Sequence, residues 1–434
     1  MIAGRPPRRG LPTQAPAIVP GDHEGDRARE LPMSSRLPDP NGAPASGAGL
    51  EYLERARAIA PTVAAHAERI EAERRIVEPV LTELHDAGLF RMLLPRTLGG
   101  AELDPPAFAR VIEEISKSDA STAWCLCQTA GCSMVAAYLR HDVARTIFAD
   151  DPRGVLAWGP HRDARAVSVP GGYRVSGTWS FASGSRHATW LGGYCAIIEA
   201  DGTPRRRHDG SAAGRTMLFP APAATFTDVW NVIGLRGTGS DTFTVKDVFV
   251  PEEHTVSRDD ESERRDSGLV YCFPTVSLFA SGFAGVALGI ARTLLDAFTA
   301  LAGEKTARAH VRPLYESAVV QSEVARGEAR LRAARSFLLT SLEETWRAAG
   351  RAGAVTLDQR ILIRLAASHA IREARAVADA AYHAAGATAI FTSGPFERRF
   401  RDLHTVAQQV QGRDDHWETV GRFLFGLTPD TTFL

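Results

Sequence analysis

The chain has 434 residues, with 50 Lys and Arg against 51 Asp and Glu, so its formal net charge at pH 7 is −1. Hydrophobic residues make up 44% and charged residues 23%, which is typical of a globular protein. These values exclude a disordered chain, a collagen-like repeat and nucleic-acid binding driven by net charge. The length alone predicts two or three domains.

Residues 1–48 are rich in Pro, Gly, Arg and Ala and show no hydrophobic period. Basic residues open this segment, but no apolar stretch follows them, so it is not a secretory signal. We expect a disordered tail, and a mitochondrial-type presequence is the alternative.

The cysteines indicate a reducing compartment. They contain no C-x-x-C pair, which argues against a disulfide framework or a thiol-rich zinc site. We therefore expect small buried side chains, no metal and a cytoplasmic location. The five cysteines are Cys125, Cys127, Cys132, Cys195 and Cys272.

Residues 49–152 are predicted to form an N-terminal helical domain. Apolar residues recur at helical spacing from Glu51 to Ile70, with charges between them. Further helices are predicted at Pro79–Ala87, Pro106–Ser116 and Ser121–Leu139.

Residues 153–257 are predicted to form a middle β domain. Short alternating runs of β-branched and aromatic residues, such as Tyr173–Val175 and Thr242–Val250, are separated by Gly, Pro and Asp. This spacing is typical of an antiparallel barrel or sandwich.

Residues 258–434 are predicted to form a C-terminal four-helix bundle, with helices at 275–302, 313–349, 357–389 and 396–425. Residues 267–291 carry no charge and are long enough for a membrane span. The amphipathic helices that follow need an apolar surface, so we expect a central buried helix and no membrane. The fold class is thus α+β, with helices, then a sheet, then a bundle.

The sequence lacks the short motifs that identify several common enzyme classes. The sequence contains no G-x-S-x-G, H-E-x-x-H or G-x-x-x-x-G-K-[ST] motif. The glycine cluster GLRGTGS (234–240) lies between two predicted strands, so it fails the context test for dinucleotide binding. The chain therefore has no evident NAD(P)H site.

Five strings, in this order, resemble the acyl-CoA dehydrogenase superfamily over residues 50–434. They are ELHDAGLFRMLLPRTLGG (83–100), DASTAWCL (119–126), SGTWSFASGSRHATW (176–190), GLRGTGSDTFTVKDVFVPEEH (234–254) and FERRFRDLHTVAQQVQGR (396–413). The resemblance implies the three-part fold predicted above, assembled as a homotetramer with flavin bound across subunits.

The resemblance also implies flavin-binding residues. The family's barrel strand presents an aromatic residue and a hydroxyl to the flavin ring, and Ser183 would form a hydrogen bond near N5. Arg308 or Arg312 matches an arginine that contacts the flavin phosphate of a neighbouring subunit. The candidate cofactor residues are Phe181, Ala182, Ser183, Gly184, Arg236, Ser240, Arg308 and Arg312.

Dehydrogenases of this family need a carboxylate base, and both usual locations are empty here. One corresponds to Ser393, and the other lies in the charge-free run 267–291. The GGYRVSGTW form of the flavin strand instead resembles the flavin-dependent monooxygenases of this superfamily. In these oxygenase components a separate NAD(P)H:flavin reductase supplies reduced FMN or FAD, which reacts with O₂ to give a flavin C4a-hydroperoxide.

We therefore expect a reduced-flavin-dependent monooxygenase, a hydroxylase or N-oxygenase, acting on a small aromatic or amino-bearing metabolite. The candidate catalytic residues are Ser183, near flavin N5, and His404 or His187, to position or deprotonate the substrate. One alternative is an acyl-CoA dehydrogenase or oxidase with Glu397 or Asp402 as its base. The other is a catalytically silent flavin-binding protein.

Overall fold

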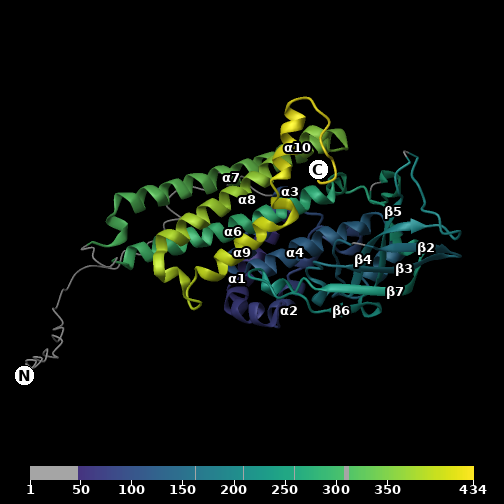
Figure 1. Cartoon of the computed structure of the whole chain (residues 1–434), viewed down its shortest axis with the longest axis horizontal. Helices are drawn as coiled ribbons and strands as arrows, with labels where there is room; N and C mark the ends of the chain where they lie inside the picture. Colours follow the sequence, from purple (N-terminus) through teal and green to yellow (C-terminus); the bar gives the residue numbers. More distant parts are fainter. Residues whose placement is uncertain (1–46, 162, 209, 259, 307–311) are drawn as a thin grey trace, which may run out of the picture.

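The structure, a computed structural model, describes residues 47–161, 163–208, 210–258, 260–306 and 312–434. Within these residues, helices are followed by a sheet and then by a helical bundle that extends away from the sheet (Figure 1). This order confirms the predicted α+β class. Nearly all of the predicted tail, 1–48, lies outside the described residues.

The N-terminal helices are capped by side chains that the local sequence supplies. Asp104 accepts the backbone N–H of Ala107 at 2.8 Å at the start of α3, and Asp119 accepts that of Thr122 at 2.7 Å at the start of α4. The helices are α1 (Gly47–Glu73), α2 (Val80–Asp86), α3 (Pro105–Ser118), α4 (Ala120–Ser133) and α5 (His141–Phe148).

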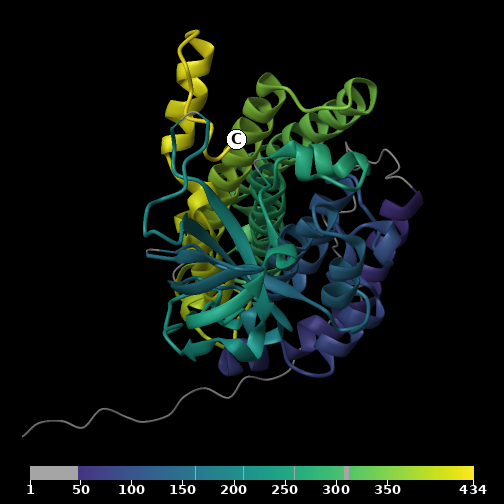
Figure 2. The same ribbon diagram turned by 90° about the vertical axis from the view of Figure 1, so that its right-hand side faces the viewer.

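The middle of the chain forms one curved, mixed sheet with the order β6-β7-β3-β2-β4-β5-β8, and β1 pairs with β4 (Figure 2). Its strands are β1 (Leu156–Trp158), β2 (Arg165–Val169), β3 (Gly172–Trp179), β4 (Trp190–Ile198), β5 (Gly214–Pro220), β6 (Thr225–Thr227), β7 (Thr242–Pro251) and β8 (Thr255–Val256).

The prediction of an antiparallel barrel or sandwich was wrong in two details. The connection after β3 crosses over, so β4 pairs parallel with β2 as well as with β1. The sheet also does not close into a barrel, because its edge strands β6 and β8 do not pair with each other. β8 pairs with β5 only at Thr216 and Met217. Pro220 at the end of β5 and Pro222 after it have no N–H to donate to a further strand.

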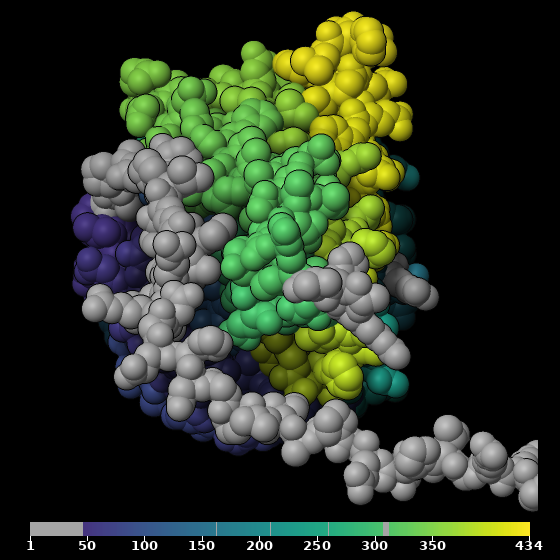
Figure 3. Space-filling model, turned by 90° about the vertical axis from the view of Figure 1, so that its left-hand side faces the viewer, coloured from purple at the N-terminus to yellow at the C-terminus, as the bar shows by residue number. Residues whose placement is uncertain are grey.

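The C-terminal part consists of α6 (Thr275–Glu304), α7 (Ala318–Ala352), α8 (Leu357–Ala385), α9 (Glu397–Gln408) and α10 (Asp415–Leu424). The predicted helix 396–425 is thus two helices, because the chain breaks at 409–414. Figure 3 shows the end of the molecule away from the sheet.

Residues 275–291 of the charge-free run form the first part of the central helix α6, and residues 267–274 precede it. Among the described residues, α6 is the one helix long and apolar enough to cross a membrane, and 89% of its most apolar stretch is buried in the protein. Gly285 and Gly289 face α3 so closely that an added Cβ would lie 2.7 Å from the carbonyl oxygen of Ala109 and 2.5 Å from that of Glu113. The absence of side chains here lets two helix backbones pack directly together.

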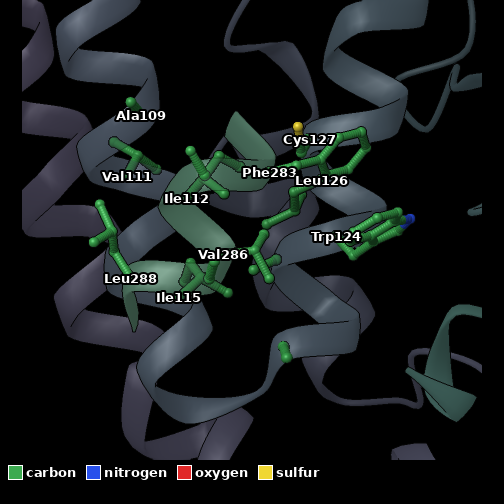
Figure 4. Close-up of a cluster of buried hydrophobic side chains, with 14 of the residues drawn as sticks. Ala109, Val111, Ile112, Ile115, Trp124, Leu126, Cys127, Phe283, Val286 and Leu288 are labelled. Atoms are coloured by element: carbon green, nitrogen blue, oxygen red, sulfur yellow. The ribbon is translucent and has the colours of Figure 1, made fainter. Parts of the chain in front are cut away.

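The same helix joins the core to the candidate site. Phe283 of α6 stacks on Trp124 of α4, with ring centroids 3.9 Å apart, inside a buried cluster that includes Ile112, Leu126 and Val286 (Figure 4). Trp124 is therefore held rigidly on its apolar side, and its indole N–H reaches toward the sheet.

Candidate functional site

The chain leaves β3 through a strained turn that displays an aromatic ring. Phe181 has a φ of 55°, a left-handed conformation that is unfavourable for a residue with a Cβ. Its side chain is 63% exposed, and its ring meets that of Trp230 edge-on at 5.9 Å. Strain of this kind is often found at functional sites, and here it places a flat apolar surface next to Ser183.

Behind this ring, buried hydroxyl groups form a chain of hydrogen bonds. The indole Nε1–H of Trp124 donates to Ser183 Oγ at 3.0 Å, and Ser183 Oγ lies 2.6 Å from Ser240 Oγ. Ser240 Oγ lies 2.8 Å from Thr238 Oγ1, which donates to the carbonyl oxygen of Leu235 at 2.8 Å. The structure thus brings Ser183 and Ser240, two of the predicted cofactor residues, into direct contact.

Proton counting gives this chain a direction. Each hydroxyl carries one proton. Since Thr238 donates its proton to Leu235, Ser240 donates to Thr238, and Ser183 donates to Ser240. Ser183 Oγ then has two lone pairs, one of which accepts from Trp124. One acceptor position therefore remains on Ser183.

This donor and acceptor set fits a reduced flavin. Reduced flavin carries a proton on N5, which needs an acceptor, whereas oxidised flavin has a bare N5 that needs a donor. Ser183 offers an acceptor, and Phe181 with Trp230 offers an apolar surface for the rings. Ala182 is buried, and Gly184 has a φ of 79° and lies against Thr129 of α4, which fixes the backbone between them.

A cavity of about 890 Å³ lies beside this turn, at the open side of the sheet. Ser185, Arg186 and Asp241 line it, and Arg186 Nε donates to Asp241 Oδ2 at 2.7 Å. Ser185 Oγ and Asp241 Oδ1 are buried without a hydrogen-bond partner among the described residues.

The geometry of His187 favours a structural role. Its Nε2 accepts the backbone N–H of Ile76 at 3.0 Å, so the ring is neutral with its proton on Nδ1. Burial, and then the nearby Arg75, lower its pKa to about 4. His187 thus fastens the connection after α1 to the sheet, and its pKa is low for a base at neutral pH.

His404 is placed like a base with an orienting carboxylate, but it faces α8. Its Nε2 lies 2.8 Å from Asp379 Oδ1, and its ring packs on Phe400 at 4.3 Å. Asp402, two residues earlier on α9, faces the loop 228–240, and residues two apart point to opposite sides of a helix. Within one subunit, therefore, the structure does not bring His404 to Ser183.

The predicted arginines are dispersed. Arg236 lies 3.7 Å from Glu71 of α1, and its buried Nε has no partner among the described residues. Arg312 is 3.8 Å from Glu316, with a largely exposed side chain in the connection between α6 and α7. Arg308 lies outside the described residues.

The positions considered for a dehydrogenase base do not supply one. Ser393 is exposed and cannot act as a carboxylate. Glu397 forms hydrogen bonds of 2.6 and 3.0 Å with Arg401. Asp402 is buried and accepts the backbone N–H of Leu235 at 2.6 Å, so its carboxylate is already engaged with the loop before β7.

Sequence reasoning missed three residues that the fold adds to this site: Trp124, Thr238 and Trp230. Trp124 and Thr238 stood inside the strings DASTAWCL and GLRGTGS, where they counted only as parts of a pattern. An unpaired indole N–H on a helix predicted to be buried is the signal that could have drawn attention to Trp124.

Comparisons with known proteins agree with this architecture. A family model described as acyl-CoA dehydrogenase, N-terminal domain, matches residues 50–145, and one described as acyl-CoA dehydrogenase, C-terminal domain, matches residues 281–412. The chain is 31% identical over 362 residues to an indole-3-acetate monooxygenase of Pseudomonas putida, which covers 83% of this chain and 90% of that relative.

Two further relatives carry the flavin in their names. The flavin-dependent monooxygenase oxygenase subunit HsaA of Rhodococcus jostii is 28% identical, over 84% of this chain and 94% of its own. The solved structure of XiaF from Streptomyces sp. in complex with FADH2 and glycerol superposes with a TM-score of 0.82. It is 26% identical and covers 89% of this chain and 98% of that one.

Proposed function

Since this chain belongs to the flavin-dependent monooxygenases of the acyl-CoA dehydrogenase superfamily, we propose that it uses reduced flavin and O₂ to oxygenate a small aromatic metabolite. When bound, the reduced flavin supplies the electrons that activate O₂. FMN and FAD both remain candidates, and XiaF was solved with FADH2.

The chain's own residues would hold the flavin as follows. Phe181 and Trp230 would contact the ring system, and Ser183 Oγ would accept a hydrogen bond from N5–H. Trp124, stacked on Phe283, holds Ser183 in place from the helical side.

The observation that carries this proposal is the direction of the hydroxyl chain, which leaves Ser183 an acceptor and no free proton. We therefore expect reduced flavin to bind more tightly than oxidised flavin. Anaerobic titration of the protein with both forms tests this directly. Equal or tighter binding of oxidised flavin would contradict the proposal, and absence of binding in both states would leave a protein without a flavin role.

Oxygenation is tested by supplying ¹⁸O₂. A panel of phenols and indoles, incubated with protein, reduced flavin and labelled oxygen, should give a product heavier by one ¹⁸O atom. The aromatic class is supported by the name of the indole-3-acetate relative. Hydrogen peroxide as the sole product across the panel would argue against this substrate class.

The partners follow from the same relationship. HsaA is named an oxygenase subunit, which supports a separate NAD(P)H:flavin reductase for this chain too. We further propose a homotetramer in the cytoplasm, because the resemblance implies flavin bound across subunits and the described cysteines are unpaired. Light scattering at micromolar concentration tests the assembly, and a monomer would refute it.

A further inference from the structure

Leu235 connects the two parts of the candidate flavin site. Its carbonyl oxygen accepts the indole N–H of Trp230 at 3.0 Å and the hydroxyl of Thr238 at 2.8 Å. Trp230 meets Phe181, and Thr238 is the last hydroxyl of the chain that begins at Ser183. One carbonyl group therefore fixes both the aromatic surface and the direction of the hydroxyl chain.

Leu235 adopts this position against its own preference. Its φ is 51°, in the left-handed region that is unfavourable for a residue with a Cβ. Gly234, just before it, lies so close to the backbone of Arg401 that a Cβ would overlap the carbonyl group. The loop thus needs a partner outside itself to hold Leu235 in place.

That partner is α9. Asp402 Oδ1 accepts the backbone N–H of Leu235 at 2.6 Å, and Arg401 donates to the carbonyl oxygen of Ile233. Asp402 is buried, and it forms a direct hydrogen bond with Leu235, the residue with the left-handed backbone. Arg401 is also bound to Glu397 of its own helix, so it braces α9 as well as the loop.

We propose that Asp402 is a positioning residue for the flavin site, whose carboxylate holds Leu235 so that Trp230 and Thr238 remain aligned with Phe181 and Ser183. The inference rests on the proposed function, since it assigns to α9 the task of ordering the same site. Asp402 touches neither flavin nor substrate in this assignment.

The charges around Asp402 make this hold sensitive to pH. Burial is the main cause that raises the pKa of Asp402 to about 7, and Asp119 at the start of α4 and Glu71 of α1 raise it further. Arg398 and the Leu235 N–H act in the opposite direction. Arg399, also on α9, feels the charge of Asp402 as well. An ionised carboxylate accepts a hydrogen bond more strongly than a protonated one, so the hold should strengthen from pH 6 to pH 8.

Hydrogen–deuterium exchange of the flavin-free protein tests the hold without activity. Exchange rates of peptides covering 228–240, corrected for the intrinsic effect of pH, should be slower at pH 8 than at pH 6. Asp402→Ala should exchange about tenfold faster at both values. Asp402→Asn keeps an acceptor oxygen but cannot ionise, so it should exchange slowly and lose the pH dependence.

Glu328→Gln provides a matched control, because Glu328 is a partly buried carboxylate that pairs with Arg292 at 2.5 Å elsewhere in the bundle. It should leave exchange of 228–240 unchanged. Wild-type exchange rates in Asp402→Ala would overturn the proposal. If that variant fails to fold, Asp402→Asn still decides, because an unchanged pH dependence there would also overturn it.

The flavin readout separates this inference from the proposed function. Asp402→Ala should bind reduced flavin about tenfold more weakly, and Asp402→Asn should restore most of the affinity at pH 8. Reduced-flavin affinity that is the same in all variants would refute the positioning role. If the wild-type protein binds no flavin at all, the proposed function fails, while the exchange measurement still decides whether Asp402 holds the loop.

Discussion

At the scale of single residues, the direction of a hydrogen bond distinguishes Ser183 from an ordinary buried serine. A serine hydroxyl normally rotates to suit any neighbour. Here Trp124 donates a hydrogen bond to Ser183 Oγ on one side. On the other side the Ser183 hydroxyl donates to Ser240, which donates to Thr238. The hydroxyl is therefore preset as an acceptor before any ligand binds, which lowers the cost of ordering the site.

Ser183→Ala should increase the share of consumed oxygen that appears as hydrogen peroxide. The substitution removes one hydrogen bond to the cofactor, which is worth about 0.5–1.5 kcal/mol, or roughly a factor of two to twelve in the peroxide-to-product ratio. It should also lower the free energy of unfolding by about 1–3 kcal/mol, because the indole N–H of Trp124 loses its acceptor. Oxygen-electrode and product assays measure the first effect, and urea unfolding measures the second.

Ser368→Ala is the matched control for this prediction. Ser368 and Ser183 are both 5% exposed, but the hydroxyl of Ser368 has no hydrogen-bond partner among the described residues. Ser368→Ala should have nearly the wild-type midpoint in urea unfolding. Its ratio of hydrogen peroxide to product should also equal that of the wild type. If both variants behave alike, the Ser183 hydroxyl has no role beyond filling space.

His187 should make the protein less stable in mild acid. Its pKa is lowered to about 4 in the folded protein, while an unfolded histidine titrates near 6.5. Stability is therefore full above the unfolded value and falls as pH drops from about 6.5 toward 4. The expected loss between pH 7 and pH 5 is about 2 kcal/mol. His187→Gln keeps an acceptor for Ile76 and should flatten this part of the stability curve. Urea unfolding measures the free energy of unfolding at pH 7 and pH 5. The same loss between the two pH values in the wild type and in His187→Gln would contradict the assignment.

At the scale of elements, α6 shows how a long apolar stretch is buried inside the protein. Its glycines let the backbone of α3 approach, and its large side chains, such as Phe283, pack toward α4. Neighbouring elements thus bury 89% of its most apolar stretch. α6 holds Trp124 in place through Phe283, and Trp124 in turn donates a hydrogen bond to Ser183 next to the sheet.

Gly285→Ala should lower the free energy of unfolding by about 1–3 kcal/mol, since the new Cβ would press on the carbonyl oxygen of Ala109 and force the two helices apart. Gly303→Ala in the same helix is the control. Nothing lies within 4 Å of the Cβ it would gain, so better helix propensity should leave stability equal or raise it by up to about 1 kcal/mol. Thermal unfolding of the two variants side by side decides the point.

At the scale of the whole molecule, the candidate site is a junction of three parts. The hydroxyl chain uses α4, the connection after β3 and the loop before β7, and α9 holds that loop from the bundle side. No one part contains a complete site. Because the site needs all three parts packed together, activity should be lost at denaturant concentrations lower than those that unfold the whole protein.

Acyl-CoA thioesters should not reduce the bound flavin. The position of the dehydrogenase base holds Ser393, and Glu397 and Asp402 are engaged with Arg401 and Leu235. General-base assistance is typically worth about 10²–10⁴-fold, so a site without it should show no bleaching on the timescale of a dehydrogenase assay. Anaerobic bleaching of oxidised flavin by any of a panel of acyl-CoAs would restore the dehydrogenase alternative.

Residues 1–46, the part of the predicted tail 1–48 that precedes α1, should be dispensable. Their sequence lacks an apolar period that could pack on the folded part. A chain that begins at Gly47 should express, assemble and bind reduced flavin as the full chain does. Loss of soluble protein on truncation would show that the segment contributes to the fold.

The sequence by itself determined what local strings encode. The order of helices, sheet and bundle follows from the switch of period from 3.6 to 2 and back. Ser183, Ser240 and the empty base position at Ser393 were instead assigned through short strings that resemble the superfamily. Both kinds of signal depend on residues close together in the chain, so neither needs the folded structure.

Only the tertiary structure decided how distant residues meet. Trp124 and Ser183 are 59 positions apart, and Leu235 and Asp402 are 167 apart. No local pattern encodes such pairs, because they depend on how α4, the sheet and α9 pack. The opening of the sheet between its edge strands β6 and β8 and the orientation of His404 toward Asp379 have the same origin. Packing, rather than residue type, sets which side of a strand or helix meets which neighbour.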